Sequence, residues 1–393
     1  MMSIMEQPKQ VDIAAYPADQ GACGYLRIIG PAMAMQENGI NASLTAETGF
    51  RCSQTPLGAL PPPWVDVLDA QVAAPVAVFQ RPLHSGFHRS IPFMQGHGTR
   101  VVVEVDDNFD CINVNNFAWP ASEPYWMEAG EISEWIESGQ EVTVFEQIPR
   151  GTMYETVEES MSHRLNLRST ISLADALVVT TPGLANHYGH LAKEVHVVPN
   201  RIPAAYLKIA SLQFARARKP YELIVGWTGQ IRTHPNDLDV LGEALLNCVE
   251  GYQFMIVGTG HGIEERVQRR PDIITGLVPI ETYPSAYAHM DIALCPLELS
   301  LFNECKSGLK ALEAASLGVV PIMSPTAEYL KLYNEGVGLI AETPDEWCEH
   351  LERLLTDEKF RLKLKGQGLE HARRETIEGN VTEWFAAWTG VEL

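Results

Sequence analysis

Short, continuously apolar segments alternate with amphipathic ones along most of this 393-residue chain, and this alternation restricts its fold more than any other feature. Buried parallel strands are near-continuous apolar runs, and the helices that connect them carry one apolar stripe. The sequence therefore predicts an α/β protein with parallel sheets. Strands are expected at 76–79, 101–105, 176–180, 195–198, 223–227, 253–257, 273–276, 292–295 and 319–323.

Helical patterns fill the intervals between these strands, and their rhythm predicts two Rossmann-like domains. A chain of this length also exceeds what one hydrophobic core usually organises. The join is placed after VVPNRIP, because its prolines continue neither a helix nor a strand ladder. Helices are expected at 31–38, 64–69, 155–173, 182–188, 238–249, 263–269, 283–289, 308–316 and 328–334.

These patterns define three predicted regions. An N-terminal domain spans 1–203, with an insertion of weak periodicity at about 119–150 that reads as an acceptor-side lid. A C-terminal domain spans 204–374. The tail, 375–393, contains the apolar sequence WFAAW and is expected to form a helix that packs back on the N-terminal domain.

The net charge of −21 disfavours broad attachment to nucleic acid or anionic lipid, because both need a basic face. The seven cysteines are scattered and never form C-x-x-C, which favours reduced thiols and gives no sequence support for a metal site. No apolar run reaches the ~20 residues of a spanning helix, and the start lacks a basic segment followed by an apolar one. A cytoplasmic location is expected.

The segment 302–322, FNECKSGLKALEAASLGVVPI, has the pattern of a helix that leads into a buried strand. A helix N-terminus carries unpaired N–H groups and a partial positive charge, so it favours anions. Lys306 adds a full charge there, Ser307 is a candidate cap or donor, and Gly308 permits close approach of a phosphate. The alternative is a capped amphipathic helix whose lysines are solvated.

This segment resembles the donor-binding motif of GT-B glycosyltransferases of the family 4 type, E-x-F-G-x-x-x-x-E followed by small residues and G-x-P-V. Residues 312–322 fit its second half, and Ser307, Gly308 and Leu309 fall on the family's Phe-Gly-Leu, whose amides contact the donor diphosphate. Cys305 stands where the family has its first carboxylate.

The resemblance implies that Glu313 accepts hydrogen bonds from ribose hydroxyls. The spacing N-x-x-K-S-x-x-K-x-x-E is similar to that of phage-encoded members.

Two further stretches resemble the same family. In VGWTGQIRTHPNDL, Gly229 permits a tight turn after a strand, and Gln230 stands where the family usually has arginine. The cationic role is then expected of Arg232 together with His234. In TGLVPIETYPSAYAHMDIALCPL, the backbone of Val278 is expected to contact the nucleotide base.

The N-terminal half supplies weaker signals. QGACGYLRIIGPAM resembles the family's glycine-containing loop after the first strand, so Gly24 and Arg27 are candidates for donor-phosphate contact. VVVEVDDNF ends a strand with Asp106 and Asp107, which are candidates to orient an acceptor hydroxyl or act as base, because the carboxyl ends of such strands face the ligand. The competing interpretation is that one of them caps a turn.

The resemblance thus implies GT-B architecture, with two Rossmann-like domains, a cleft between them, and a retaining, metal-independent glycosyltransferase that needs no cofactor. The donor is expected to be a nucleotide sugar, UDP- or GDP-linked; the acceptor is open among a small molecule, a glycan, a protein and a modified DNA base. The catalytic candidates are Lys306, Arg232, Asp106 and Asp107. Three alternatives stay open: a sugar-nucleotide epimerase, a non-catalytic nucleotide-sugar-binding protein and an α/β scaffold with an interaction role only.

Overall fold

The computed structural model describes residues 12–19, 21–44, 74–83, 85–112, 116, 157–213, 223–248 and 251–392. The helix expected at 64–69 and the insertion expected at about 119–150 lie outside these residues. Among the described helices, none combines the length and the apolar character that crossing a membrane requires.

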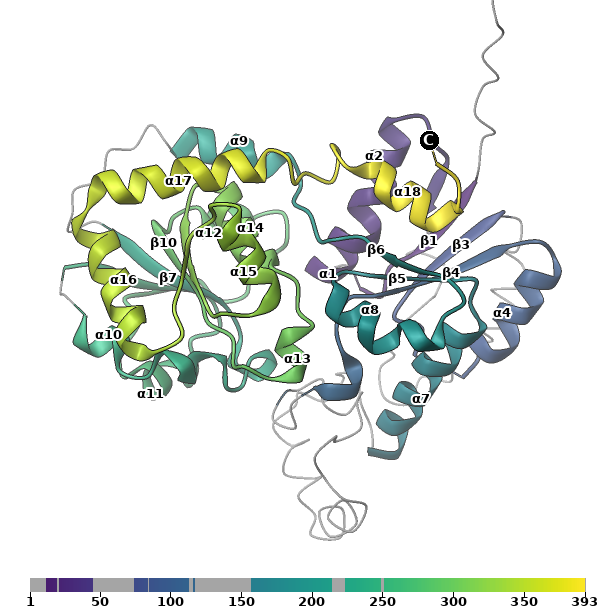
Figure 1. The fold of residues 1–393 in the computed structure, drawn as a ribbon, viewed down its shortest axis with the longest axis horizontal. Helices are drawn as coiled ribbons and strands as arrows, with labels where there is room; N and C mark the ends of the chain where they lie inside the picture. Colours follow the sequence, from purple (N-terminus) through teal and green to yellow (C-terminus); the bar gives the residue numbers. More distant parts are fainter. Residues whose placement is uncertain are drawn as a thin grey trace, which may run out of the picture. The chain divides into compact units, whose positions relative to one another are not determined.

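The chain divides into two compact units (Figure 1). Unit 1 comprises residues 1–110, 120–199 and 380–393, and unit 2 comprises 111–119 and 200–379. The C-terminal helix α18 (Val381–Thr389) therefore belongs to unit 1, although the sequence reaches it only after the whole of unit 2.

Unit 1 is built on a six-stranded parallel sheet with the order β2-β1-β3-β4-β5-β6. The apolar runs predicted at 76–79, 101–105, 176–180 and 195–198 form four of these strands, whereas β1 and β2 were not predicted. The inner strands are buried along their length, and the edge strands β2 and β6 are partly exposed. The strands are β1 (Ile13–Tyr16), β2 (Ala42–Leu44), β3 (Val76–Gln80), β4 (Arg100–Val105), β5 (Ala176–Val179) and β6 (Val195–Val197).

The first helical segment of unit 1 consists of α1 (Ala22–Gly24), a π-helical turn, η1 (Tyr25–Ile29), and α2 (Gly30–Glu37). Helix α8 (Pro182–Tyr188) starts with proline, and the Thr181 hydroxyl caps it by accepting from the Leu184 N–H. The others are α4 (Phe87–Gly96), α7 (Val157–Leu173), η4 (Gly189–Leu191) and α18, and η2 (Phe109–Cys111) spans the boundary between the units.

A buried ion pair joins three elements of unit 1. Arg27, in η1, lies 2.8 Å from the carboxylate of Glu104 near the end of β4, and both side chains are 1% exposed. Helix α18 closes the pair: the Trp388 indole donates to Glu104 at 2.9 Å, and the Trp384 ring lies 5.3 Å from the Arg27 guanidinium carbon. Arg27 also donates to the Val198 carbonyl.

Unit 2 contains a second six-stranded parallel sheet, with the order β12-β11-β10-β7-β8-β9. In chain order this is 6-5-4-1-2-3, the doubly wound arrangement of dinucleotide-binding folds. The direction of winding reverses between β7 and β10. The strands are β7 (Ile224–Gly229), β8 (Gln253–Gly258), β9 (Ile273–Ile274), β10 (Ile292–Cys295), β11 (Val320–Met323) and β12 (Leu339–Ile340).

Helices cover both faces of this sheet, since the buried apolar residues of unit 2 form two clusters that share the strands. Alternate residues of β8 show the division: Met255 and Val257 belong to one cluster, Phe254 and Ile256 to the other. The first face carries α9 (Ala205–Gln213), α12 (Tyr283–Tyr287), α14 (Leu309–Ser316) and α15 (Ala327–Asn334); the second carries η7 (Asp237–Leu241), α10 (Ala244–Asn247), α11 (Ile263–Val267) and α16 (Pro344–Thr356). Three further elements are η6 (Ile231–Thr233), α13 (Leu301–Glu304) and α17 (Glu358–Ala372).

The prediction of an α/β fold with two Rossmann-like domains is confirmed. One predicted helix, 238–249, is wrong as a single element. It divides into η7 and α10, because Gly242 has φ 48° and a Cβ there would lie 2.9 Å from the Pro344 ring. The chain turns at this glycine.

Candidate active site

The candidate site lies in unit 2, where the winding of the sheet reverses between β7 and β10. Open α/β sheets bind ligands outside the carboxyl ends of the strands at this point. β7 ends in Gly229, which pairs with Gly258 at the end of β8, and both have φ above 140°. A Cβ on Gly258 would lie 1.9 Å from the Gly229 carbonyl oxygen, so glycine is required there.

Helix α14 points its N-terminus toward this edge of the sheet. Its N-cap is Gly308, and no side chain caps it. Ser307, expected as a cap, instead has its hydroxyl 2.8 Å from the Asn200 amide nitrogen. A Cβ on Gly308 would lie 2.6 Å from Leu332 of α15, so packing between the two helices also favours glycine at this position. The uncapped N–H groups still favour an anion.

Lys310, in the first turn of α14, is the functional candidate that sequence reasoning missed. Its ammonium lies 3.2 Å from Nε2 of His234 and 5.4 Å from the centre of the Trp227 ring. Burial, with the Lys306 cation adding to it, lowers the pKa of Lys310 to about 8. The signal in the sequence was the spacing Lys310-x-x-Glu313, which puts both side chains on one face of the helix.

A buried chain of polar groups fixes the position of Lys310. His234 Nδ1 lies 2.6 Å from the Asp237 carboxylate, whose other oxygen accepts from the Glu298 N–H at 3.0 Å and from the Asn303 amide at 2.8 Å. Burial and the Lys310 cation lower the pKa of His234 to about 4. His234 is therefore neutral at pH 7, with Nδ1–H donating to Asp237 and Nε2 accepting from Lys310.

Glu313 follows Lys310 by one turn and is 3% exposed. Its carboxylate accepts from the Tyr283 hydroxyl at 3.2 Å, and the same hydroxyl lies 3.3 Å from Oγ1 of Thr228 at the end of β7. Burial raises the pKa of Glu313 to about 7, against the opposing influence of Tyr283 and Lys310. A second hydroxyl group could replace Tyr283 as its donor.

The remaining predicted residues of unit 2 surround this centre. The Lys306 ammonium lies 4.5 Å from the centre of the Phe302 ring and is close enough to Lys310 to lower the pKa of that lysine. Arg232 is exposed, on η6. Cys305, at the position where the family has a carboxylate, is buried. Gln230 precedes η6, Val278 is half-buried against the core that contains α12, and Leu309 begins α14.

In unit 1 the predicted residues have different surroundings. Asp106 is buried, with Arg81 Nε at 3.5 Å and the Gln80 amide at 3.4 Å, whereas Asp107 is half-buried. Sequence reasoning missed Arg81.

Arg27 and Gly24 were predicted to contact the donor from unit 1. In the structure, packing within unit 1 explains both residues. The guanidinium of Arg27 is enclosed with Glu104 and helix α18, so the structure does not present it to a ligand. A Cβ on Gly24 would lie 1.8 Å from the Asp19 carbonyl oxygen, so this glycine serves a close contact within its own loop.

Comparison with known proteins finds one family that matches part of the chain and several solved structures that have a similar fold. Residues 222–357 match the family described as glycosyl transferases group 1. Three similar solved structures are sucrose-phosphate synthase (tll1590) from Thermosynechococcus elongatus, Alr3699/HepE from Anabaena in complex with UDP and glucose, and the catalytic domain of starch synthase IV from Arabidopsis thaliana bound to ADP and acarbose. No curated protein matches the sequence.

These structural matches extend over nearly the whole chain at low identity. The identities are 14%, 12% and 12%, and the TM-scores are 0.56, 0.58 and 0.57. The alignments cover 95%, 96% and 97% of this chain and 98%, 98% and 99% of the others. At such identities the likeness concerns the fold alone.

The two parallel sheets with their flanking helices place this chain in the GT-B fold class. Within that class the match of residues 222–357 identifies unit 2 as a glycosyl transferases group 1 domain. The resemblance to glycosyltransferases seen in the sequence is confirmed.

Proposed function

We propose that this enzyme moves a sugar from a nucleotide sugar, UDP- or GDP-linked, to an acceptor hydroxyl with retention of anomeric configuration. One observation carries the proposal: Lys306 and Lys310 converge on the uncapped N-terminus of α14. Two cations at the positive end of a helix repel one another and the helix dipole, so a bound anion would be favourable at this position. A diphosphate has the charge and size to fill this role.

The leaving diphosphate is the group whose charge grows in the transition state. We assign its stabilisation to Lys310, Lys306 and the N–H groups of Gly308 and Leu309, because preorganised donors of this kind are often the largest catalytic contribution. His234 acts through Lys310, whose ammonium it holds. Arg232 and Gln230 are proposed to contact the donor from the loop after β7, with Gly229 allowing the close approach of that loop.

No protein nucleophile is required by this proposal. The donor's own phosphate takes the acceptor proton as the glycosidic bond breaks, and the two lysines supply the charge that a metal ion supplies in other transferases. Asp106 and Asp107 stay candidates for orienting the acceptor, and the backbone of Val278 for contacting the base.

The test is a screen of UDP- and GDP-sugars for thermal stabilisation, followed by incubation of the best donor with small-molecule, glycan, protein and DNA acceptors. Release of nucleoside diphosphate with transfer of the sugar mass to an acceptor supports the proposal, and the anomeric proton coupling in the product decides retention. Isomerised donor without an acceptor would indicate an epimerase. Tight binding without turnover would indicate a non-catalytic binding protein. This outcome is tested because Cys305 and Gln230 each replace a polar residue that the family has at that position.

Glu313→Ala should weaken the binding of UDP or GDP about 10- to 100-fold, since the loss of a charge-assisted hydrogen bond costs about 1.5–3 kcal/mol. We propose that the ribose replaces the Tyr283 hydroxyl as the donor to this carboxylate. Calorimetry with the nucleoside diphosphate measures the change. Glu335→Ala, an exposed carboxylate just after α15, is the matched control. Equal affinity in the two variants would refute the ribose assignment.

Binding of the diphosphate should also take up protons near pH 8. The pKa of Lys310 is lowered to about 8 in the free protein, and a bound anion raises it, so a group that is about half neutral at this pH becomes fully charged. Affinity therefore falls as the pH rises through 8. Calorimetry in two buffers of different ionisation enthalpy gives the uptake, expected at about half a proton. The same uptake in Lys310→Gln would contradict the assignment.

A further inference from the structure

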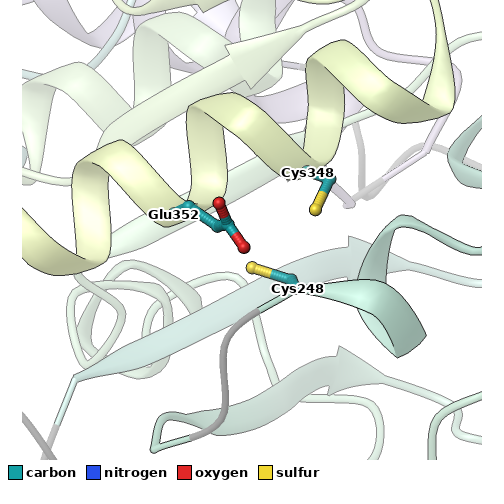
Figure 2. Close-up of side chains that lie close together, drawn as sticks. All are labelled: Cys248, Cys348 and Glu352. Atoms are coloured by element: carbon teal, nitrogen blue, oxygen red, sulfur yellow. The ribbon is translucent and has the colours of Figure 1, made fainter.

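A second cluster of reactive side chains lies in unit 2, among residues that the proposed transfer does not use. The ligand atoms of Cys248, Cys348 and Glu352 all lie within 4.8 Å of one another. Figure 2 shows the three side chains pointing toward a common centre, two of them from one helix and the third from the end of another element. From this convergence we propose that they bind a thiophilic divalent cation, for which Zn²⁺ is the best match.

The local structure explains how the three groups meet. Cys348 and Glu352 are four residues apart on α16, so they lie on one face of that helix, one above the other. Cys248 is the C-cap of α10, the short helix that precedes β8. The two helices share one apolar cluster, to which Leu245, Trp347 and Leu351 contribute. The cluster fixes the backbone from which the ligands project.

The degree of burial suits a cation site at the margin of a core. Cys248 is 7% exposed, and Cys348 and Glu352 are half-buried. The ligands are therefore partly shielded from bulk water, yet the ion can enter without opening the sheet. A fourth position is left for water, as in sites with three protein ligands.

The two thiolates and the carboxylate determine which metal ion fits the site. Zn²⁺ binds thiolate sulfur at about 2.3 Å and carboxylate oxygen at about 2.0–2.2 Å, so two sulfurs on one tetrahedral ion lie about 3.8 Å apart. Small side-chain rotations bring the observed group to that spacing. Sulfur ligands disfavour Mg²⁺ and Ca²⁺. On binding, the two thiols lose their protons to solvent and the ion takes both sulfurs and one carboxylate oxygen, so the ion and its three ligands together carry one net negative charge.

The site would be separate from the proposed transfer site, because none of its residues belongs to the set around Lys310 and His234. It would join α10 to α16, so the bound ion would resist the separation of these helices from each other. The sequence contains no C-x-x-C, and the two cysteines come together only through the fold. This inference does not depend on the proposed reaction.

The experiment uses the full chain, reduced and stripped of metal with a chelator that is then removed. Titration with Zn²⁺ should saturate at one ion per chain and raise the unfolding midpoint by about 5 °C or more at a hundredfold excess over Kd. Co²⁺ should give the intense absorption bands of thiolate coordination. Cys348→Ser and Cys248→Ser should lose those bands and most of the shift, whereas Cys23→Ser, an exposed cysteine of unit 1, should keep both.

Glu352→Gln keeps the core intact and should weaken Zn²⁺ binding at least tenfold, which guards against a cysteine variant that fails to fold. Two results would overturn the proposal. One is the absence of saturable binding in the reduced chain. The other is Zn²⁺ binding that is equal in the wild type and in Cys348→Ser.

Discussion

Lys310→Ala is expected to lower kcat/KM by about 10²- to 10³-fold, the loss that follows removal of one preorganised donor to developing charge. The lysine ammonium is held at the N-terminus of α14 by His234, which is itself fixed by Asp237. The variant should fold normally, because the lysine is half-buried and its hydrogen-bond partner, His234, is neutral. Steady-state kinetics with the donor found by the screen measure the effect.

The matched control is Lys331→Ala, an exposed lysine on the neighbouring helix α15, which should keep wild-type kinetics. Lys306→Ala should also lose most turnover, since its cation lies at the same helix end. Wild-type kinetics in Lys310→Ala would remove this lysine from the mechanism, and wild-type kinetics in both lysine variants would end the proposal that α14 binds the diphosphate.

The fold was predictable because parallel strands with helices on both faces leave a strong trace in the sequence. A run such as VVVEV at 101–105 is buried along its whole length in β4, as its composition indicates. The failure at 238–249 has a local cause. Its apolar periodicity suits one helix, but the left-handed conformation of Gly242 and its contact with Pro344 interrupt it.

The candidate site was predictable only in part, because motifs report positions along the chain and not which side chains meet. The segment that contains α14 could be found from its resemblance to a known motif. That Lys310 meets His234, which is 76 residues away, depends on the sheet order that places β7 beside β10. Arg27 shows the opposite error: a cation near a glycine loop suggests a phosphate, yet its partner is Glu104, which the sequence hides within an apolar strand.

Arg27→Met is expected to lower the free energy of unfolding of unit 1 by about 3–5 kcal/mol, because removing one member of a buried pair leaves the other charge uncompensated. Glu104 is 1% exposed, and burial already raises its pKa. A group whose pKa is raised on folding favours the folded state at low pH, so the loss should shrink as the pH falls and Glu104 becomes protonated. Denaturant unfolding followed by the fluorescence of Trp384 and Trp388 measures it.

Two variants separate the effect of the pair from that of an arginine in general. Arg89→Met, an exposed arginine on α4, should change the stability by less than about 0.5 kcal/mol. Arg27→Met combined with Glu104→Gln should recover much of the loss, because the uncharged amide still accepts from the Trp388 indole and needs no cation. If Arg27→Met alone were as stable as Arg89→Met, the buried pair would contribute nothing to the attachment of α18. If the double variant were no more stable than Arg27→Met, the lost stability would come from the packing of Arg27 on Trp384 and its bond to Val198, and not from the isolated carboxylate.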